Sequence, residues 1–106
     1  MINASGFKVW PAEVESILYK HPAVQEACVI ASTDLRRGET VKAVVVLRDE
    51  YKEKNSPEEI IEWSKGQLAA YKYPRIVQFA DALPRSGTGK ILRRELQTQE
   101  NAATRQ

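Results

Sequence analysis

Residue types that build catalytic and metal sites are scarce in this chain. Its 106 residues include one cysteine, Cys28, and one histidine, His21. One cysteine excludes an intrachain disulfide, and these two residues cannot supply the ligand sets of the usual zinc sites, so we predict no metal site. Cys28 lies in the apolar run "ACVIA", which favours a small buried hydrophobe over a nucleophile. His21 precedes Pro22 at an expected helix end, where a cation suits the helix dipole.

Long apolar runs and a strong charge of one sign are also absent. No stretch approaches the ~20 apolar residues of a membrane-spanning helix, and the opening "INASGFKVW" lacks the basic and apolar segments of a signal peptide. We therefore expect a cytoplasmic protein without a transmembrane segment. A net charge of +2 does not by itself indicate a nucleic-acid partner. With 42% hydrophobic and 28% charged residues, the chain is expected to fold as one small globular domain.

The first half of the chain alternates between strand and helix patterns. "FKVW" alternates with a period of two after the turn-like "NASG", so we predict a hairpin over residues 2–10. Pro11 suits the first turn of a helix, and apolar residues at helical spacing continue that helix until Pro22. "VQEACVIAST" and "TVKAVVVLR" are rich in β-branched residues and predict two strands separated by the turn "DLRRGE". The second strand is apolar on both faces, which indicates that helices cover both sides.

The second half predicts two helices and one strand. Ser56, followed by a proline and then by a glutamate at the third position, is typical of a helix N-cap with a capping box. "RIVQFA" predicts a short strand, and a final helix is expected to begin near Lys90. The polar residues 98–106 are expected to form a flexible tail after a domain of residues 1–97. The order of elements indicates an α+β fold, with a small N-terminal hairpin and a central, mostly antiparallel sheet flanked by helices.

The stretch "LPRSGTGKILRREL" presents one lysine, Lys90, at the end of a short loop spaced by glycines. Gly87 and Gly89 give the backbone positive-φ freedom and remove side-chain bulk, so the loop is suited to insertion into another surface. Small residues followed by a lysine are also how proteins approach phosphates. On a helical wheel, Lys90, Arg93 and Arg94 share one face, and a solvated basic face is the plain alternative.

Two nucleotide-binding motifs do not fit this loop. A P-loop needs a glycine where the chain has Pro84, and a serine or threonine after the lysine, where the chain has Ile91. The dinucleotide fingerprint needs a longer glycine spacing within a strand–turn–helix unit. The loop therefore does not indicate a nucleotide-binding fold.

Three stretches together resemble one protein family. "MINASGFKVWPAEVE", "RRGETVKAVVVL" and "LAAYKYPRIVQFADALPRSGTGKILRREL" are similar to the C-terminal domain of the adenylate-forming superfamily, which includes acyl-CoA synthetases, luciferases and the adenylation domains of peptide synthetases. The resemblance is strongest to bacterial-type fatty acyl-CoA synthetases and covers residues 1–96 in the family's order. The chain lacks the Ser/Thr/Gly-rich ATP loop of the family's N-terminal domain. We therefore expect an excised domain or fragment, which is inactive alone.

The resemblance implies a catalytic role for Lys90. Family enzymes use ATP to convert a carboxylate into an acyl-adenylate, release pyrophosphate, and then transfer the acyl group to CoA. Lys90 matches the lysine that these enzymes use for adenylation. The loop that would carry it to the substrate contains Ser86, Gly87, Thr88 and Gly89.

The resemblance also implies a second functional segment and a set of partners. The loop that would face the thioester-forming site contains Ser5, Gly6, Phe7 and Lys8. ATP, magnesium and CoA would be substrates or cosubstrates of the full enzyme, and none would be bound by this domain alone. The partners would be the N-terminal adenylating domain of the same enzyme, a fatty acid and CoA, and the role would lie in fatty acid metabolism.

Two other functions stay open at this point. A stand-alone module would bind the phosphates of RNA or DNA through four basic residues: Arg85, Lys90, Arg93 and Arg94. That patch is short, and no aromatic residues interleave with it, so the domain of an acyl-CoA synthetase is the favoured interpretation and we expect no nucleic-acid partner. Within the superfamily, the acyl acceptor would be either free CoA or the pantetheine of a carrier protein.

Overall fold

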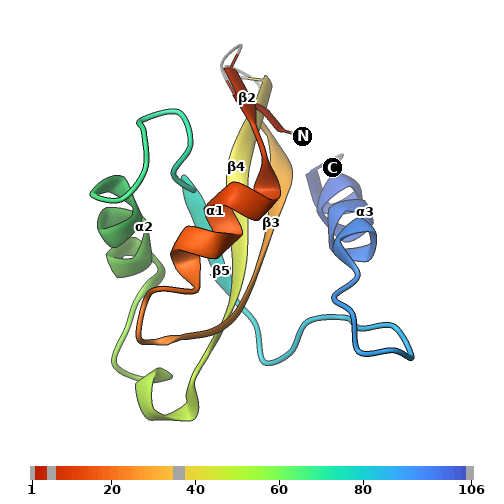
Figure 1. Ribbon diagram of the computed structural model, residues 1–106. Coiled ribbons are helices and arrows are strands. Elements are labelled where there is room, and N and C mark those ends of the chain that lie inside the picture. Colours follow the sequence, from red (N-terminus) through yellow and green to blue (C-terminus); the bar gives the residue numbers. More distant parts are fainter. Residues whose placement is uncertain (1, 5–6, 35–37, 105–106) are drawn as a thin grey trace.

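The protein is a five-stranded sheet with helices packed on both faces (Figure 1). The computed structural model describes residues 2–4, 7–34 and 38–104. The elements are β1 (Ile2–Ala4), β2 (Phe7–Val9), α1 (Pro11–Leu18), β3 (Val24–Asp34), β4 (Gly38–Leu47), the short 3₁₀ helix η1 (Asp49–Tyr51), α2 (Pro57–Lys65), β5 (Ile76–Phe79) and α3 (Arg93–Thr104). The predicted α+β class and the predicted order of strands and helices are confirmed.

Strand β4 is the centre of the sheet. It pairs with β3 in a long antiparallel ladder, from Leu47 opposite Val24 to Gly38 opposite Asp34. It also pairs with β5 in parallel, and its first residue pairs antiparallel with β1. β1 and β2 form the predicted N-terminal hairpin. The sheet is therefore mostly antiparallel, as predicted, with one parallel pair.

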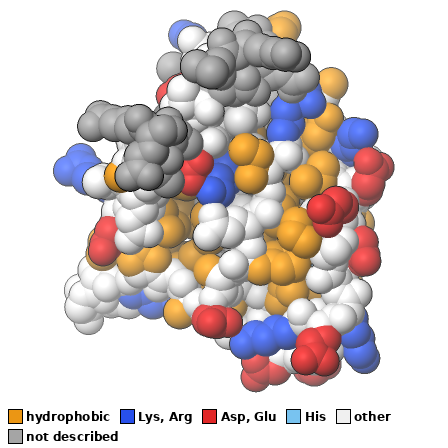
Figure 2. All heavy atoms as spheres, turned by 180° about the vertical axis from the view of Figure 1, so that it is seen from behind, with side chains coloured by type: hydrophobic (Ala, Val, Ile, Leu, Met, Phe, Trp, Pro, Cys, Tyr) orange, Lys and Arg blue, Asp and Glu red, His pale blue; other side chains and the backbone are white. Residues whose placement is uncertain are grey.

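Side chains of β4 alternate between two apolar layers. On one face, Val41 and Val45 join a cluster with residues of α1 and α2, and on the other, Val44 and Val46 join Cys28 and Leu83. Leu96 of α3 packs against this second cluster. Viewed from behind, hydrophobic side chains gather over the middle of one face, with charged side chains around them (Figure 2). The prediction that helices cover both sides of this strand is confirmed.

Local signals position α1 and α2 as predicted. Pro11 lies in the first turn of α1, and the apolar residues Val14 and Leu18 are fully buried against the sheet. The hydroxyl of Ser56 accepts a hydrogen bond from the backbone N–H of Glu59 (3.3 Å), which caps the N-terminus of α2. These two helices form one layer over the sheet.

Helix α3 differs from the sequence-based expectation at both ends. It begins at Arg93, so Lys90 precedes the helix and does not share a helical face with Arg93 and Arg94. Residues 98–104 were expected to be a flexible tail, yet they continue the helix to Thr104.

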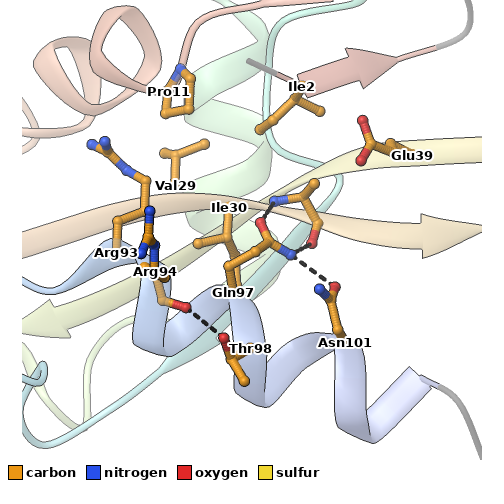
Figure 3. Close-up of a pocket in the computed structure, with 11 residues that line it drawn as sticks. Ile2, Pro11, Val29, Ile30, Glu39, Arg93, Arg94, Gln97, Thr98 and Asn101 are labelled. Carbon is orange, nitrogen blue, oxygen red and sulfur yellow. Dashed lines mark hydrogen bonds between the residues drawn. The ribbon is translucent and has the colours of Figure 1, made fainter.

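Tertiary contacts account for the longer helix. The amide of Gln97 bonds both the N–H and the carbonyl of Ala31 (2.8 Å each), and Figure 3 shows this side chain reaching from α3 to the sheet. Farther along the helix, Glu100 pairs with the nearly buried Lys42 (2.5 Å) and accepts a hydrogen bond from Ser32 (2.7 Å). A polar segment that looks like a tail in the sequence is thus anchored to the central strands.

We expect Glu100→Gln to lower the free energy of unfolding by about 2 kcal/mol, because it removes charge-assisted hydrogen bonds to a nearly buried lysine. Urea titration of the 106-residue chain measures this loss. Glu62→Gln is the matched control, since Glu62 pairs with Lys65 on an exposed helix surface and should change stability by less than ~0.5 kcal/mol. Equal effects of the two substitutions would contradict the prediction.

The same ion pair gives a pH dependence with a definite sign. Burial acts to raise the pKa of Glu100, but hydrogen bonds from Lys42 and Ser32 outweigh burial and lower this pKa. The unfolded chain therefore binds the proton at a higher pH than the folded chain does. The stabilisation should be complete above about pH 4.3, the ordinary glutamate pKa, and should be lost as pH falls through the lower folded value. In Glu100→Gln, the free energy of unfolding measured from pH 7 to pH 3 should fall less steeply than it does in the unsubstituted chain.

Candidate functional site

Lys90 lies on a narrow loop, residues 84–92, whose two arms are joined by backbone hydrogen bonds; we call it the lysine loop. Arg85 and Ile91 form an isolated antiparallel bridge, and the N–H of Leu92 donates to the carbonyl of Pro84 (2.9 Å). Closer to the tip, the N–H of Ser86 donates to the carbonyl of Lys90 (2.9 Å). The loop is therefore a small closed hairpin, although its sequence is polar and rich in small residues.

A tight turn forms the tip of this loop. The N–H of Gly89 donates to the carbonyl of Ser86 (2.9 Å), and the Ser86 hydroxyl lies 2.8 Å from the Thr88 hydroxyl. The Ser86 hydroxyl also accepts a hydrogen bond from the N–H of Lys90 (3.3 Å). Gly89 has φ of 86°, a conformation that favours glycine, whereas Gly87 does not adopt a positive φ. Of the two glycines that give this loop positive-φ freedom, Gly89 uses that freedom and Gly87 does not.

The tip of the loop is open to its surroundings. Lys90 and the residues before it from Gly87 are exposed, and a Cβ added at Gly87 or Gly89 would meet no atom within 4 Å. On its inner side the loop borders a hollow of about 380 Å³, which Lys90 lines together with Tyr19 and Cys28. The ammonium of Lys90 is thus carried on a structured but protruding segment.

Ion pairs engage the basic side chains on either side of Lys90. Arg85 pairs with Glu26 of β3, and Arg93 pairs with Glu15 of α1 (2.5 Å). The other oxygen of Glu15 accepts the backbone N–H of Val29 (2.8 Å). No local sequence pattern points to Glu15 or Glu26, because each lies far from its arginine along the chain.

The four basic residues considered for nucleic-acid binding do not form one free patch. Arg85 and Arg93 are paired with carboxylates, as described above. Arg94 lines a different hollow of about 490 Å³, between α3 and the sheet, and Figure 3 shows it there beside Gln97. This arrangement gives no support to the nucleic-acid alternative.

Neither Cys28 nor His21 has the environment of a nucleophile or its base. Burial, followed by the nearby charge of Glu15, raises the pKa of the Cys28 thiol to about 11, so the thiol stays neutral at physiological pH. The prediction of a buried hydrophobe is confirmed. His21 does not act as a helix-end cation: its Nδ1 accepts the N–H of Ala23 (3.0 Å), and burial lowers its pKa despite the charge of Glu59.

The hairpin predicted to face the thioester-forming site lies well away from the lysine loop. The β1–β2 hairpin pairs with Gly38 at one end of the β3–β4 ladder, whereas the lysine loop contacts Glu26 near the opposite end of β3 (Figure 1). Phe7 is 54% exposed and stacks on Tyr71, with 4.6 Å between ring centroids, while Lys8 is exposed. Ser5 and Gly6 lie outside the described residues. The structure therefore does not bring the two predicted segments together.

Comparison with known families decides the identity of this domain. The sequence model of the AMP-binding enzyme C-terminal domain matches residues 13–90, a segment that ends at the candidate lysine. The chain belongs to the AMP-binding enzyme C-terminal domain family. The resemblance predicted from the sequence motifs is confirmed.

Related proteins are acyl-CoA synthetases. This AMP-binding C-terminal domain is 47% identical over 103 residues to "Acyl-coenzyme A synthetase ACSM1, mitochondrial" from Mus musculus, which covers 94% of the chain. It is similar in structure to the Mycobacterium tuberculosis fatty acyl CoA synthetase, with a TM-score of 0.87, 41% identity and 97% of the chain covered. The anthranilate CoA ligase AuaEII, solved in complex with anthranoyl-AMP, superimposes over 100% of the chain with a TM-score of 0.89 and 37% identity.

The domain accounts for a small part of these relatives. It spans 18% of the mouse synthetase, 20% of the Mycobacterium tuberculosis enzyme and 21% of the anthranilate ligase. The mouse relative is named as mitochondrial, which gives no support to the cytoplasmic expectation for this chain. Within residues 2–4, 7–34 and 38–104, no helix is both long and apolar enough to cross a bilayer.

The two glycines of the lysine loop in this AMP-binding C-terminal domain should respond differently to substitution. Gly89→Ala should lower the free energy of unfolding by about 1 kcal/mol, because alanine is strained at a positive φ. Gly87→Ala is the matched control and should have a smaller effect, since its backbone is unstrained and the added Cβ has open space. Urea unfolding of both variants measures the difference. Equal losses would mean that the turn geometry at Gly89 is not required.

Proposed function

We propose that this chain is the mobile C-terminal domain of an AMP-forming acyl-CoA synthetase, in which Lys90 assists formation of the acyl-adenylate. The main support is the presentation of Lys90: an exposed ammonium on a closed loop, next to a glycine with φ of 86°, within a matched family segment. Such a loop can enter the active site of a separate domain without carrying bulky side chains with it.

The proposed role of Lys90 is electrostatic. When a carboxylate oxygen attacks the α-phosphate of ATP, a P–O bond forms to the carboxylate, the bond to pyrophosphate breaks, and negative charge accumulates on the phosphoryl oxygens. An ammonium group placed beside these oxygens stabilises the transition state more than the ground state. Lys90 would thus speed adenylation without forming a covalent bond to the substrate.

The β1–β2 hairpin is proposed to serve the second half-reaction. There the thiol of CoA attacks the acyl carbonyl, the thioester bond forms, and AMP leaves. The hairpin and the lysine loop lie at separate ends of the sheet, so a rotation of the domain would present one and then the other to a single active site (Figure 1). Phe7 and Lys8 are exposed at the hairpin and are the described residues available for that contact.

The N-terminal adenylating domain of the same enzyme is the proposed partner, and it would hold ATP with magnesium and most of the acyl pocket. Within the described part of this chain, no group of three or more His, Cys, Asp or Glu side chains could hold a metal ion. The relatives named as acyl-coenzyme A synthetases support CoA as acceptor, and the fatty acyl CoA synthetase among the solved structures supports a fatty acid as substrate.

The decisive test compares Lys90 with Lys90→Ala in an active chimera of this chain with a compatible acyl-CoA synthetase N-terminal domain. Fatty-acid-dependent ATP–pyrophosphate exchange should fall about 100-fold, because a placed charge is lost from the transition state. Thioester formation from supplied acyl-adenylate should be retained, since that step uses the other face. Lys54→Ala, which removes an exposed lysine elsewhere, is the control and should leave both reactions unchanged. Unchanged exchange in Lys90→Ala would refute the proposal.

A further inference from the structure

Arg85 connects the tip of the lysine loop to strand β3. Its Nη1 donates to the carbonyl of Gly89 (2.6 Å), and its Nη2 pairs with Glu26 of β3. The other polar contacts described for Ser86, Thr88 and Lys90 stay within the loop itself. One side chain thus bonds both the fixed sheet and the peptide group that immediately precedes Lys90.

The planar guanidinium makes this double contact possible. Arginine presents several N–H donors in a rigid fork, so two of its nitrogens can bond different acceptors at a fixed mutual angle. A lysine has one compact ammonium at the end of a flexible chain and does not hold two acceptors in such an arrangement. The contact therefore depends on arginine geometry as well as on positive charge.

The arm that follows Lys90 is held by different contacts. Ile91 packs against the apolar layer beneath α3, and Arg93 pairs with Glu15 (2.5 Å). The arm that precedes Lys90 follows the buried Leu83 and ends in a tip where a Cβ added at Gly87 or Gly89 would meet no atom within 4 Å. Between Leu83 and this tip, the Arg85–Glu26 pair joins the arm to β3. The direction of the Lys90 peptide is thus set from the Arg85 side of the loop.

The stability contribution of this pair is small, because Arg85 is 41% exposed and such surface pairs are worth ~0–1 kcal/mol. Misplacement of a catalytic group by about 1 Å, however, can cost as much as two decades of rate. We propose that Arg85 is a positioning residue for adenylation: through Glu26 and the Gly89 carbonyl, it holds the loop so that the Lys90 ammonium points at the substrate. This inference rests on the function proposed above for Lys90.

The test uses the same active chimera and both half-reactions. Arg85→Ala and Arg85→Lys should each lower fatty-acid-dependent ATP–pyrophosphate exchange about tenfold, because neither variant can bond Glu26 and Gly89 together. Thioester formation from supplied acyl-adenylate should stay unchanged in both variants, which separates positioning from a general loss of folding. Arg48→Ala, which removes an exposed arginine at the end of β4, should leave both reactions unchanged.

A double variant tests whether Arg85 acts through Lys90. In the Lys90→Ala background, adding Arg85→Ala should change exchange by less than about twofold, because there is no ammonium left to position. If the two losses multiply, or if Arg85→Lys keeps full exchange, the positioning role is overturned. If Lys90→Ala itself leaves exchange intact, it is the proposed function that fails. A loss with Lys90→Ala but none with Arg85→Ala overturns the present inference alone.

Discussion

The antiparallel pairing of β3 with β4 is the constraint on which the other contacts of this domain depend. Both strands carry apolar side chains on both faces, so each face needs a covering layer. Helices α1 and α2 cover one face, and α3 with the segment around Leu83 covers the other. The lysine loop leads into α3. The position of the loop follows from the requirement that α3 pack back against β3.

Charged residues at the edges of the apolar layers set the details that function would use. Glu15 and Glu26 lie on or beside β3 and hold the two arginines that flank Lys90. Lys42 and Glu100 hold the far end of α3 against the central strand. In each case a carboxylate and a cation from distant parts of the chain meet because the elements that carry them pack around β3 and β4. Among the described residues, no carboxylate pairs with the ammonium of Lys90, and this residue is exposed.

Much of the fold was predictable because its signals are local. Alternation in the strands, the Ser56 cap of α2 and the proline at the start of α1 each act within a few residues, and each prediction was confirmed. The start of α3 was predicted too early, since the pattern from Lys90 onward suits a helix, while the backbone pairing of Arg85 with Ile91 holds Lys90 and Ile91 in a hairpin and the helix begins at Arg93. The expected tail failed for a similar reason, because polar residues 98–104 gain partners only once β3 and β4 have assembled.

The sequence by itself determined the family, the class and order of elements, and the candidate lysine, because motif spacing and hydrophobic period are properties of neighbouring residues. Only the tertiary structure decided that Gly89 and not Gly87 takes the positive φ, and that the loop and the hairpin lie at separate ends of the sheet. The pairing of Arg85 with Glu26 is likewise visible only in the tertiary structure. Such contacts join residues far apart in the chain, and they depend on strand register and on the path of α3, which no local pattern encodes.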